Sequence, residues 1–269
     1  MEAVAASKMR RAQDATLASR EYANKAREVM AYLASQPATQ AGSMPLLEQR
    51  PVEKIGLVLI TPDRGLAGAL VSNVIRTAVD FIKSQDVPVT IISVGRKGTQ
   101  FMARYNYPLH ATFREIPDLP STVDLAPVAR VAVDDFSDGA FDQVFLCYTD
   151  FVNTLRQAPV VRQMLPLQPP EAEEVTKVDY EFEPDPQTIL NEILPRFTLL
   201  QIYQAILEAQ ASEHSARMVA MRSATDNAAE LAEDLTLTYN KARQTAITME
   251  ILDIAGGAEA LVKARAASS

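Results

Sequence analysis

Residues 212–261 read SEHSARMVAMRSATDNAAELAEDLTLTYNKARQTAITMEILDIAGGAEAL, and this stretch decides the fold. No proline interrupts it, and no glycine occurs before Gly256. As a helix rising ~1.5 Å per residue it would be ~75 Å long, which exceeds the diameter of a compact domain. Helix propensity alone does not stabilise such a length in water. The stretch therefore predicts a rod that needs a partner helix or a surrounding sleeve of other proteins.

A second long helix is predicted near the N-terminus, over residues 1–36. Its small and apolar residues recur in alternating steps of four and three, which is typical of a left-handed coiled coil. A surface helix packed on a globular core is the alternative, but that favours a wider stripe of large residues. The residues of this seam are Ala5, Met9, Ala12, Thr16, Ser19, Ala23, Ala26, Met30 and Leu33.

The C-terminal helix, predicted over residues 187–266, repeats the same steps. We expect Pro195 to kink it or to restart its first turns. Two distant helices with matching seams predict an antiparallel intramolecular coiled coil. The second seam consists of Ile193, Phe197, Leu200, Gln204, Leu207, Ala211, His214, Met218, Met221, Thr225, Ala228, Ala232 and Leu235.

The intervening residues 52–184 show a different pattern. Short continuous apolar runs, typical of buried strands, alternate with helical segments. This alternation predicts parallel strand pairing and a Rossmann-like α/β domain flanked by the coiled coil. The predicted strands are 54–61, 87–94 and 143–149, with a further strand within 152–167 and an edge strand at 178–182; the predicted helices are 66–84, 97–105 and 123–136.

Composition excludes several classes of protein. The formal net charge of −8 at pH 7 argues against nonspecific nucleic-acid binding. No apolar run reaches the ~20 residues of a membrane-spanning helix, so we expect membrane association only through partners. The single Cys147 lies in an apolar run and is interpreted as a buried, inert strand thiol.

Two glycine-containing turns follow predicted strands, at residues 63–68 (DRGLAG) and 95–98 (GRKG). Phosphate binds at such positions in Rossmann-like folds, but the sequence has neither GxGxxG nor GxxxxGK[ST]. We interpret the first as a tight turn between strand and helix, and the second as a solvated loop. The two histidines, His110 and His214, lack the spacing of a zinc site. We expect no catalytic residue, no metal and no cofactor.

Ordered blocks of sequence carry a resemblance to a known family. Residues 247–260 (ITMEILDIAGGAEA) resemble the terminal signature of the gamma subunit of F-type ATP synthases. Further blocks resemble the same family in the same order, so the resemblance covers essentially the whole chain. They are residues 5–10 (AASKMR), 63–66 (DRGL), 212–214 (SEH), 218–221 (MVAM), 224–227 (ATDN) and 239–244 (YNKARQ).

The resemblance implies a non-catalytic central-stalk rotor that couples ion-driven rotation of a membrane ring to ATP synthesis, and that pumps ions in reverse. Its implied partners are the alpha and beta subunits, the epsilon subunit and the membrane c-ring. The implied location is peripheral, on the cytoplasmic face of a bacterial plasma membrane. Arg243 and Gln244 would engage a catch loop of a beta subunit, while Thr248, Glu250 and Asp253 would bear against the ring of alpha and beta subunits.

One departure from the family concerns the N-terminus. Gamma subunits normally carry further helical turns before the segment that resembles residues 1–9. The alternatives are a start codon assigned too late, a truncated chain and a naturally short arm, and we expect one of the first two. The sequence also lacks the insertion with paired cysteines that chloroplast members of the family carry.

Without the family, a nucleotide-binding module or enzyme built on the α/β domain remains the alternative function. Polar residues such as Arg243 and Glu250 would then be an ordinary solvated helix face. The absence of a phosphate-binding loop from the sequence counts against this alternative.

Overall fold

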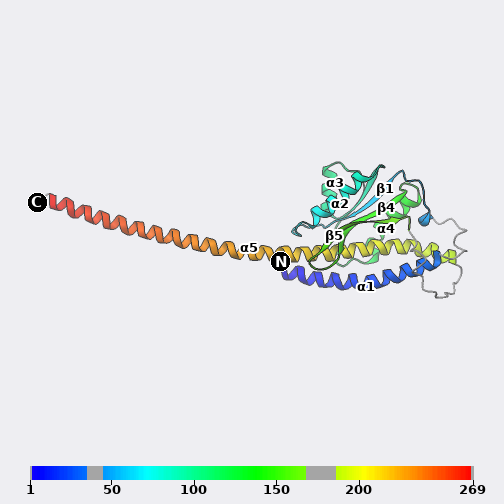
Figure 1. Cartoon of the computed structure of the whole chain (residues 1–269), viewed down its shortest axis with the longest axis horizontal. Coiled ribbons are helices and arrows are strands. Elements are labelled where there is room, and N and C mark those ends of the chain that lie inside the picture. The colour runs from blue at the N-terminus through cyan, green and yellow to red at the C-terminus, as the bar shows by residue number, and fades with distance from the viewer. Residues whose placement is uncertain (1, 35–44, 168–185, 268–269) are drawn as a thin grey trace. The chain divides into compact units, whose positions relative to one another are not determined.

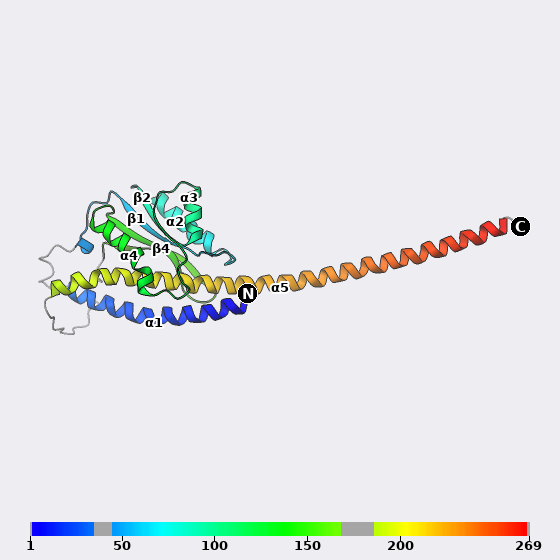
Figure 2. The same ribbon diagram turned by 180° about the vertical axis from the view of Figure 1, so that it is seen from behind.

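The computed structural model describes residues 2–34, 45–167 and 186–267. Within these ranges a five-stranded sheet lies between helices, and two long helices flank it (Figures 1 and 2). The elements are α1 (Glu2–Ala34), η2 (Pro45–Leu47), β1 (Ile55–Ile60), α2 (Leu70–Ser84), β2 (Val89–Val94), α3 (Arg96–Arg104), β3 (Leu109–Phe113), α4 (Thr122–Ser137), β4 (Gln143–Phe151), β5 (Gln157–Leu165) and α5 (Pro186–Ala267).

The strands follow the order β3-β2-β1-β4-β5. β1 pairs in parallel with both β2 and β4, and β2 pairs in parallel with β3, so these strands end at the same edge of the sheet. β5 runs antiparallel to β4. The predicted α/β class with flanking helices is confirmed.

Alternate strand residues form two hydrophobic cores, one on each face of the sheet. Val58, Ile60 and Leu146 point into the core that includes α4 and the first half of α5. Leu57 and Leu59 point into the core beneath α2 and α3. This period of two, with both faces buried, explains why the parallel strands read as continuous apolar runs.

Helix α1 lies alongside the first half of α5 and runs in the opposite direction, as both views show (Figures 1 and 2). Ala12 of α1 and Ala211 of α5 are fully buried and pack together with Phe151 of β4. Alanines at the contact allow two helices to approach closely. The predicted antiparallel helix pair is confirmed for this region.

The predicted α1 seam is buried wherever its side chains are described: Ala5, Met9, Ala12 and Thr16. Thr16 satisfies its hydroxyl by donating to the carbonyl of Ala12 at 2.8 Å. The side chains of Ala23 and Ala26 lie outside the described residues. On α5 the seam residues Met218 and Met221 are half-buried, whereas Leu235 is 60 % exposed.

The β-sheet differs from the prediction in two ways. The sequence reading missed β3, a short strand whose burial is only partial along its length. The expectation of parallel pairing is wrong for β5. Its connection to β4 is short and reverses the direction of the chain, whereas parallel neighbours need a longer crossover. Asn153 builds that tight connection by accepting hydrogen bonds from the backbone N–H of Leu155 and Arg156. The predicted edge strand at 178–182 lies outside the described residues.

Two helices also differ from the prediction. α2 begins at Leu70 rather than residue 66, because Leu66 (φ 62°) and Gly68 (φ 57°) adopt left-handed backbone conformations that a helix excludes. α5 is not restarted at Pro195. Leu194 and Phe197, on either side of this proline, are both buried in one core, and that packing outweighs the local cost of proline.

Contacts between residues divide the chain into two compact units, Met1–Ala220 and Met221–Ser269. The boundary falls within α5, so α1 and the first half of α5 belong to the same unit as the sheet. The domain limits 1–36, 52–184 and 187–266 drawn from sequence remain a prediction.

Replacing Ala12 by leucine tests the close packing of α1 on α5. The added bulk has no space beside Ala211, so we expect the free energy of unfolding to fall by ~1–3 kcal/mol. Ala18→Leu is the matched control, since Ala18 is exposed on the same helix. Its effect should stay within ~0.5 kcal/mol. Urea unfolding followed by circular dichroism measures both, and equal stability of the two variants would contradict this packing.

Candidate partner-binding surface

All five predicted partner-contact residues lie in the second half of α5. Arg243, Gln244, Thr248, Glu250 and Asp253 are exposed, as are all described side chains from residue 222 to 264. Thr248 donates its hydroxyl to the carbonyl of Gln244 at 2.9 Å, which fixes it against its own helix. These side chains are therefore available to a partner.

Helical geometry separates these residues into different faces. At ~100° per residue, Arg243 and Glu250 lie within ~20° of each other, while Gln244 and Thr248 share a face ~100–140° away. The set therefore forms no single polar patch and no catalytic constellation. A partner that contacts all of them must reach around the helix.

The same segment exposes large apolar side chains. Ile247, Ile251 and Ile254 lie within ~60° of one another, whereas Met249 and Leu252 lie ~140–200° from Ile247. A helix that is apolar on all sides is normally buried. The exposed large apolar residues of this unit are Leu231, Leu235, Leu237, Tyr239, Ile247, Met249, Ile251, Leu252, Ile254, Leu261 and Val262.

No helix in the described parts of the chain is long and apolar enough to cross a membrane. Charged residues such as Lys241, Arg243 and Glu250 also lie among the apolar ones. The pattern instead fits enclosure by protein.

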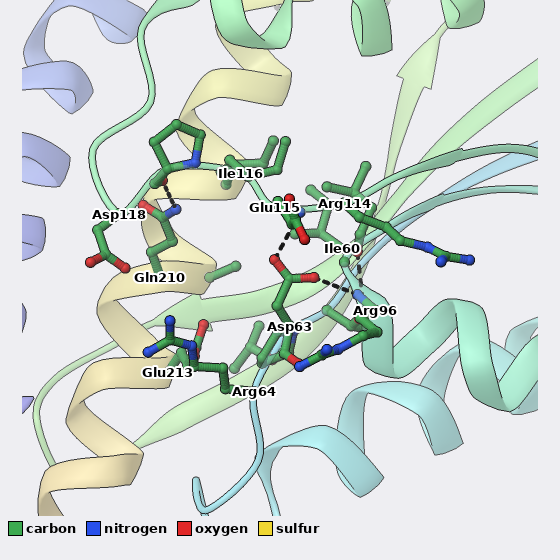
Figure 3. A pocket seen from close by; sticks show the side chains of 18 of the residues that line it. Ile60, Asp63, Arg64, Arg96, Arg114, Glu115, Ile116, Asp118, Gln210 and Glu213 are labelled. Carbon is green, nitrogen blue, oxygen red and sulfur yellow. Dashed lines mark hydrogen bonds between the residues drawn. The ribbon is translucent and has the colours of Figure 1, made fainter. Parts of the chain in front are cut away.

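A second candidate site lies at the carboxyl edge of the parallel strands, in the unit formed by residues 1–220. A cavity of about 660 Å³ opens there between the strand ends and α5. Asp63 lies at its centre (Figure 3). Its Oδ1 accepts from the backbone N–H of Arg96 at 2.7 Å, and its Oδ2 accepts from that of Glu115 at 3.0 Å.

Charged groups of both signs line this cavity. Four are acidic and three are arginines: Asp63, Glu115, Asp118, Glu213, Arg64, Arg96 and Arg114. The lining therefore has no strong preference for an anion. Arg96 donates to the carbonyl of Asp63 through both Nε and Nη2.

Close packing explains why position 95 is a glycine. At φ 94° a Cβ would lie 1.8 Å from the carbonyl oxygen of Thr61. The neighbouring Gly98 donates its N–H to Thr61 Oγ1 at 2.8 Å. The segment 95–98 is thus not the solvated loop that the sequence predicts, because both glycines are buried and it forms the start of α3.

Three relationships to known proteins bear on these surfaces. A family model described as ATP synthase matches residues 1–261. An ATP synthase gamma chain from Dehalococcoides mccartyi (strain CBDB1) is 52% identical over 261 residues, which is 97% of this chain and 92% of that protein.

This chain belongs to the ATP synthase gamma chain family.

An ATP synthase gamma chain from Herpetosiphon aurantiacus is 50% identical, and the match covers 97% of this chain and 92% of that protein. A chain in the central stalk/c-ring structure of Tetrahymena thermophila mitochondrial ATP synthase shares the fold, with a TM-score of 0.64 and 24% identity. That match covers 84% of this chain and 97% of the other. The relatives of this chain are thus gamma chains of ATP synthase rather than its catalytic subunit.

In this gamma chain, α5 is joined to the sheet edge by side chains that the sequence reading did not assign. Gln210 donates to the carbonyl of Pro117 at 2.7 Å, and Ser212 donates to that of Thr149 at 3.2 Å. Arg217 donates to the carbonyl of Gly65 at 3.2 Å and pairs with Glu213. Hydrogen bonds to backbone carbonyls leave no sequence pattern, so only the family blocks around 212–221 pointed to this region.

Charged groups from several elements meet around His214. Lys8 of α1 hydrogen-bonds Asp118 and thereby lowers the pKa of that carboxyl. Burial lowers the pKa of His214 to about 4, so the ring is neutral at pH 7. Its Nδ1 faces Arg217 Nη1 at 3.4 Å and its Nε2 lies 3.9 Å from Asp118. Burial raises the pKa of Glu213, against the opposing effect of Arg217.

The remaining candidate residues have structural roles. His110 lies 2.8 Å from Asp135. Cys147 is fully buried, and burial raises the pKa of its thiol to about 12, as expected of an inert strand cysteine. Among the described residues, no group of three His, Cys, Asp or Glu side chains could hold a metal ion.

The neutral His214 predicts acid sensitivity. Its pKa of about 4 in the folded chain lies below the unfolded value of 6.5, so the unfolded state binds more protons between these values. Stability from this group is present above pH ~6.5 and is lost as the pH falls towards ~4, by at most ~3 kcal/mol.

Urea unfolding at pH 7 and pH 5 measures this loss. His214→Gln removes the titrating group but keeps a polar side chain, so its stability should fall less over that range than the wild type's. The raised pKa of Glu213 acts in the opposite direction and is present in both proteins, so the difference isolates His214. Parallel pH profiles would contradict the buried neutral ring.

Proposed function

We propose that this gamma chain is the rotor that couples rotation of a membrane ring, driven by an ion gradient, to conformational cycling of catalytic beta subunits. In the reverse direction, ATP hydrolysis would turn it and pump ions. The observation that supports this most is the helix around Ile247–Ile254, which carries large apolar side chains on opposite sides and yet is exposed. Such a helix fits a sleeve that encloses it.

Polar residues within that apolar surface supply the asymmetry that coupling requires. A shaft with equal contacts to all states of a catalytic site would bias none of them. Arg243 and Gln244 would grip a catch loop of one beta subunit, and Thr248, Glu250 and Asp253 would bear on the surrounding alpha and beta subunits. Because these side chains lie on different faces, each orientation of the shaft presents a different contact to a given beta subunit.

The unit formed by residues 1–220 would meet the other partners. We propose that the α/β domain docks on the epsilon subunit and on the membrane c-ring. The gamma chain would then be peripheral, held at the cytoplasmic face of a bacterial plasma membrane through these partners. The large apolar side chains exposed on this unit, among them Leu155 at 84 % and Val123 at 78 %, are candidates for such contacts.

Co-expression tests the proposed assembly. We expect the isolated chain to self-associate through its exposed apolar residues. Co-expression with alpha and beta subunits should give a stable complex containing one gamma chain per ring, measured by native mass spectrometry. Failure to co-purify under native conditions would argue strongly against the rotor.

Nucleotide binding by the α/β domain is the competing function. Among the described residues, the cavity beside Asp63 is the feature that would favour it, but the sequence has neither GxGxxG nor GxxxxGK[ST] to bind a phosphate there. Calorimetry of the purified chain with ATP and ADP discriminates between the two functions. A rotor predicts no stoichiometric binding, whereas tight binding at one site per chain would favour the competing function.

Arg243→Ala tests the catch. Arginine offers a planar, permanently charged group suited to a carboxylate of the beta subunit. Losing a charged hydrogen bond is worth ~1.5–3 kcal/mol, which is ten- to a hundredfold in rate if it acts entirely on the transition state. ATP turnover by the assembled complex should slow accordingly, while nucleotide affinity of isolated beta subunits is unchanged.

Lys241→Ala is the matched control for this experiment. Lys241 is exposed on the same turn and carries the same charge, but it points ~160° away from Arg243 around the helix. Its loss should leave turnover within about twofold of the wild type, equivalent to ~0.4 kcal/mol. Equal turnover by the Arg243→Ala and Lys241→Ala assemblies would show that Arg243 makes no catch.

A further inference from the structure

Helix α5 contacts two separate loops at the carboxyl edge of the sheet. Arg217 reaches the loop between β1 and α2 at the carbonyl of Gly65, 3.2 Å away. One face of α5 also presents Gln210, which reaches the loop between β3 and α4 at the carbonyl of Pro117, 2.7 Å away. Both acceptors are backbone atoms, so each bond holds the path of the chain and not merely a mobile side chain.

The two loops are themselves joined by Asp63. This residue belongs to the first loop, and its Oδ2 accepts from the backbone N–H of Glu115 in the second loop at 3.0 Å. Figure 3 shows Asp63 between the two loops and a dashed line from Gln210 to the second loop. Arg217, Asp63 and Gln210 thus close a ring of contacts that runs from α5 through both loops and back to α5. We call these three side chains the bracket.

Helix α1 is tied into the same arrangement. Lys8 bonds Asp118, one residue after the carbonyl that Gln210 holds. The bracket therefore connects the sheet edge to both members of the helix pair. It lies wholly within the unit formed by residues 1–220.

Polar contacts in these positions add directional bonds to the apolar packing. Ile202 and Ile206 bury α5 against the sheet, and their packing already opposes axial rotation of the helix, although the hydrophobic effect itself is non-directional. Hydrogen bonds are directional and weaken steeply when their geometry is lost. A ring of such bonds to two different loops fixes the rotation of α5 about its own axis.

The buried ion pair between Arg217 and Glu213 orients the Arg217 side chain for its bond to Gly65. Both side chains are largely buried, at 12 % and 14 % exposure. A buried ion pair contributes little net stability, because desolvation offsets the attraction. The pair does, however, hold the guanidinium in one orientation, with Nη2 directed at Gly65. Arg217 is accordingly placed as the residue that positions the bracket.

We propose that the bracket is the element through which torque passes between α5 and the α/β domain, with Arg217 as its positioning residue. This inference rests on the proposed rotor function. It adds the location at which the shaft is locked to the domain that docks on the membrane ring. Loss of the bracket would let α5 turn or slip relative to the sheet under load, while leaving residues 221–264 and their contacts unchanged.

Arg217→Ala tests the bracket in the complete complex in membrane vesicles. We expect ATP hydrolysis by the detached alpha–beta–gamma head to stay within about twofold of wild type. Gradient-driven ATP synthesis and ATP-driven ion pumping should fall about tenfold relative to hydrolysis. Arg217→Lys, which keeps the charge but not the planar group, should recover part of this loss. Hydrogen exchange at the amides of residues 64–68 should be faster in Arg217→Ala.

Two further variants make the result decisive. Gln210→Met cuts a different bond of the ring with a neutral side chain of similar size, so it should lower coupling even if Arg217→Ala fails to assemble. Arg76→Ala, which removes an exposed arginine of α2, is the control and should couple normally. Wild-type coupling in Arg217→Ala, or in Gln210→Met, would overturn the bracket. Failure of the rotor itself is distinguishable, since the wild-type chain would then not co-purify with alpha and beta subunits.

Discussion

The burial of the first half of α5 against the sheet is the interaction on which the rest of the structure depends. Helix propensity cannot stabilise a helix that runs from Pro186 to Ala267 in water, so tertiary packing must anchor it. Leu194, Ile202 and Ile206 supply that anchor from one side, and Ala211 meets α1 from the other. The described residues beyond 221 have no such packing within the chain. The proposed sleeve of alpha and beta subunits would account for their apolar surface.

Two kinds of contact divide the work of a stalk subunit along one helix. Around Arg217 the contacts are directional bonds to backbone carbonyls, which suit a fixed joint. Around Ile251 the surface is mostly apolar with separated polar groups, which suits a bearing that must slip past its partners. A bearing built from many hydrogen bonds would resist turning, whereas a joint gains from directional bonds added to its close packing. The amino-acid composition of each region thus matches its proposed mechanical role.

Sequence patterns predicted most of the architecture, because strands that are buried on both faces of the sheet consist of continuous apolar residues. The runs at 54–61 and 143–149 could only be buried strands, and the steps from Ala5 to Thr16 marked the face of α1 that packs. The sequence could not reveal β3, whose partial burial leaves no apolar run. Nor could it reveal the bonds of Gln210 and Arg217, since a backbone carbonyl accepts from any donor that the fold brings near. The contact role predicted for Arg243 and Gln244 came only from the resemblance to the family.

Rotation of the α/β domain against an immobilised ring of alpha and beta subunits tests the central claim most directly. A bead attached through Lys83→Cys, at an exposed position on α2, reports that motion, since the only other cysteine, Cys147, is buried and its thiol pKa is raised. With ATP present, the account predicts stepwise rotation of the bead in one direction at a rate set by turnover. A stationary bead on complexes that hydrolyse ATP at the full rate would contradict it.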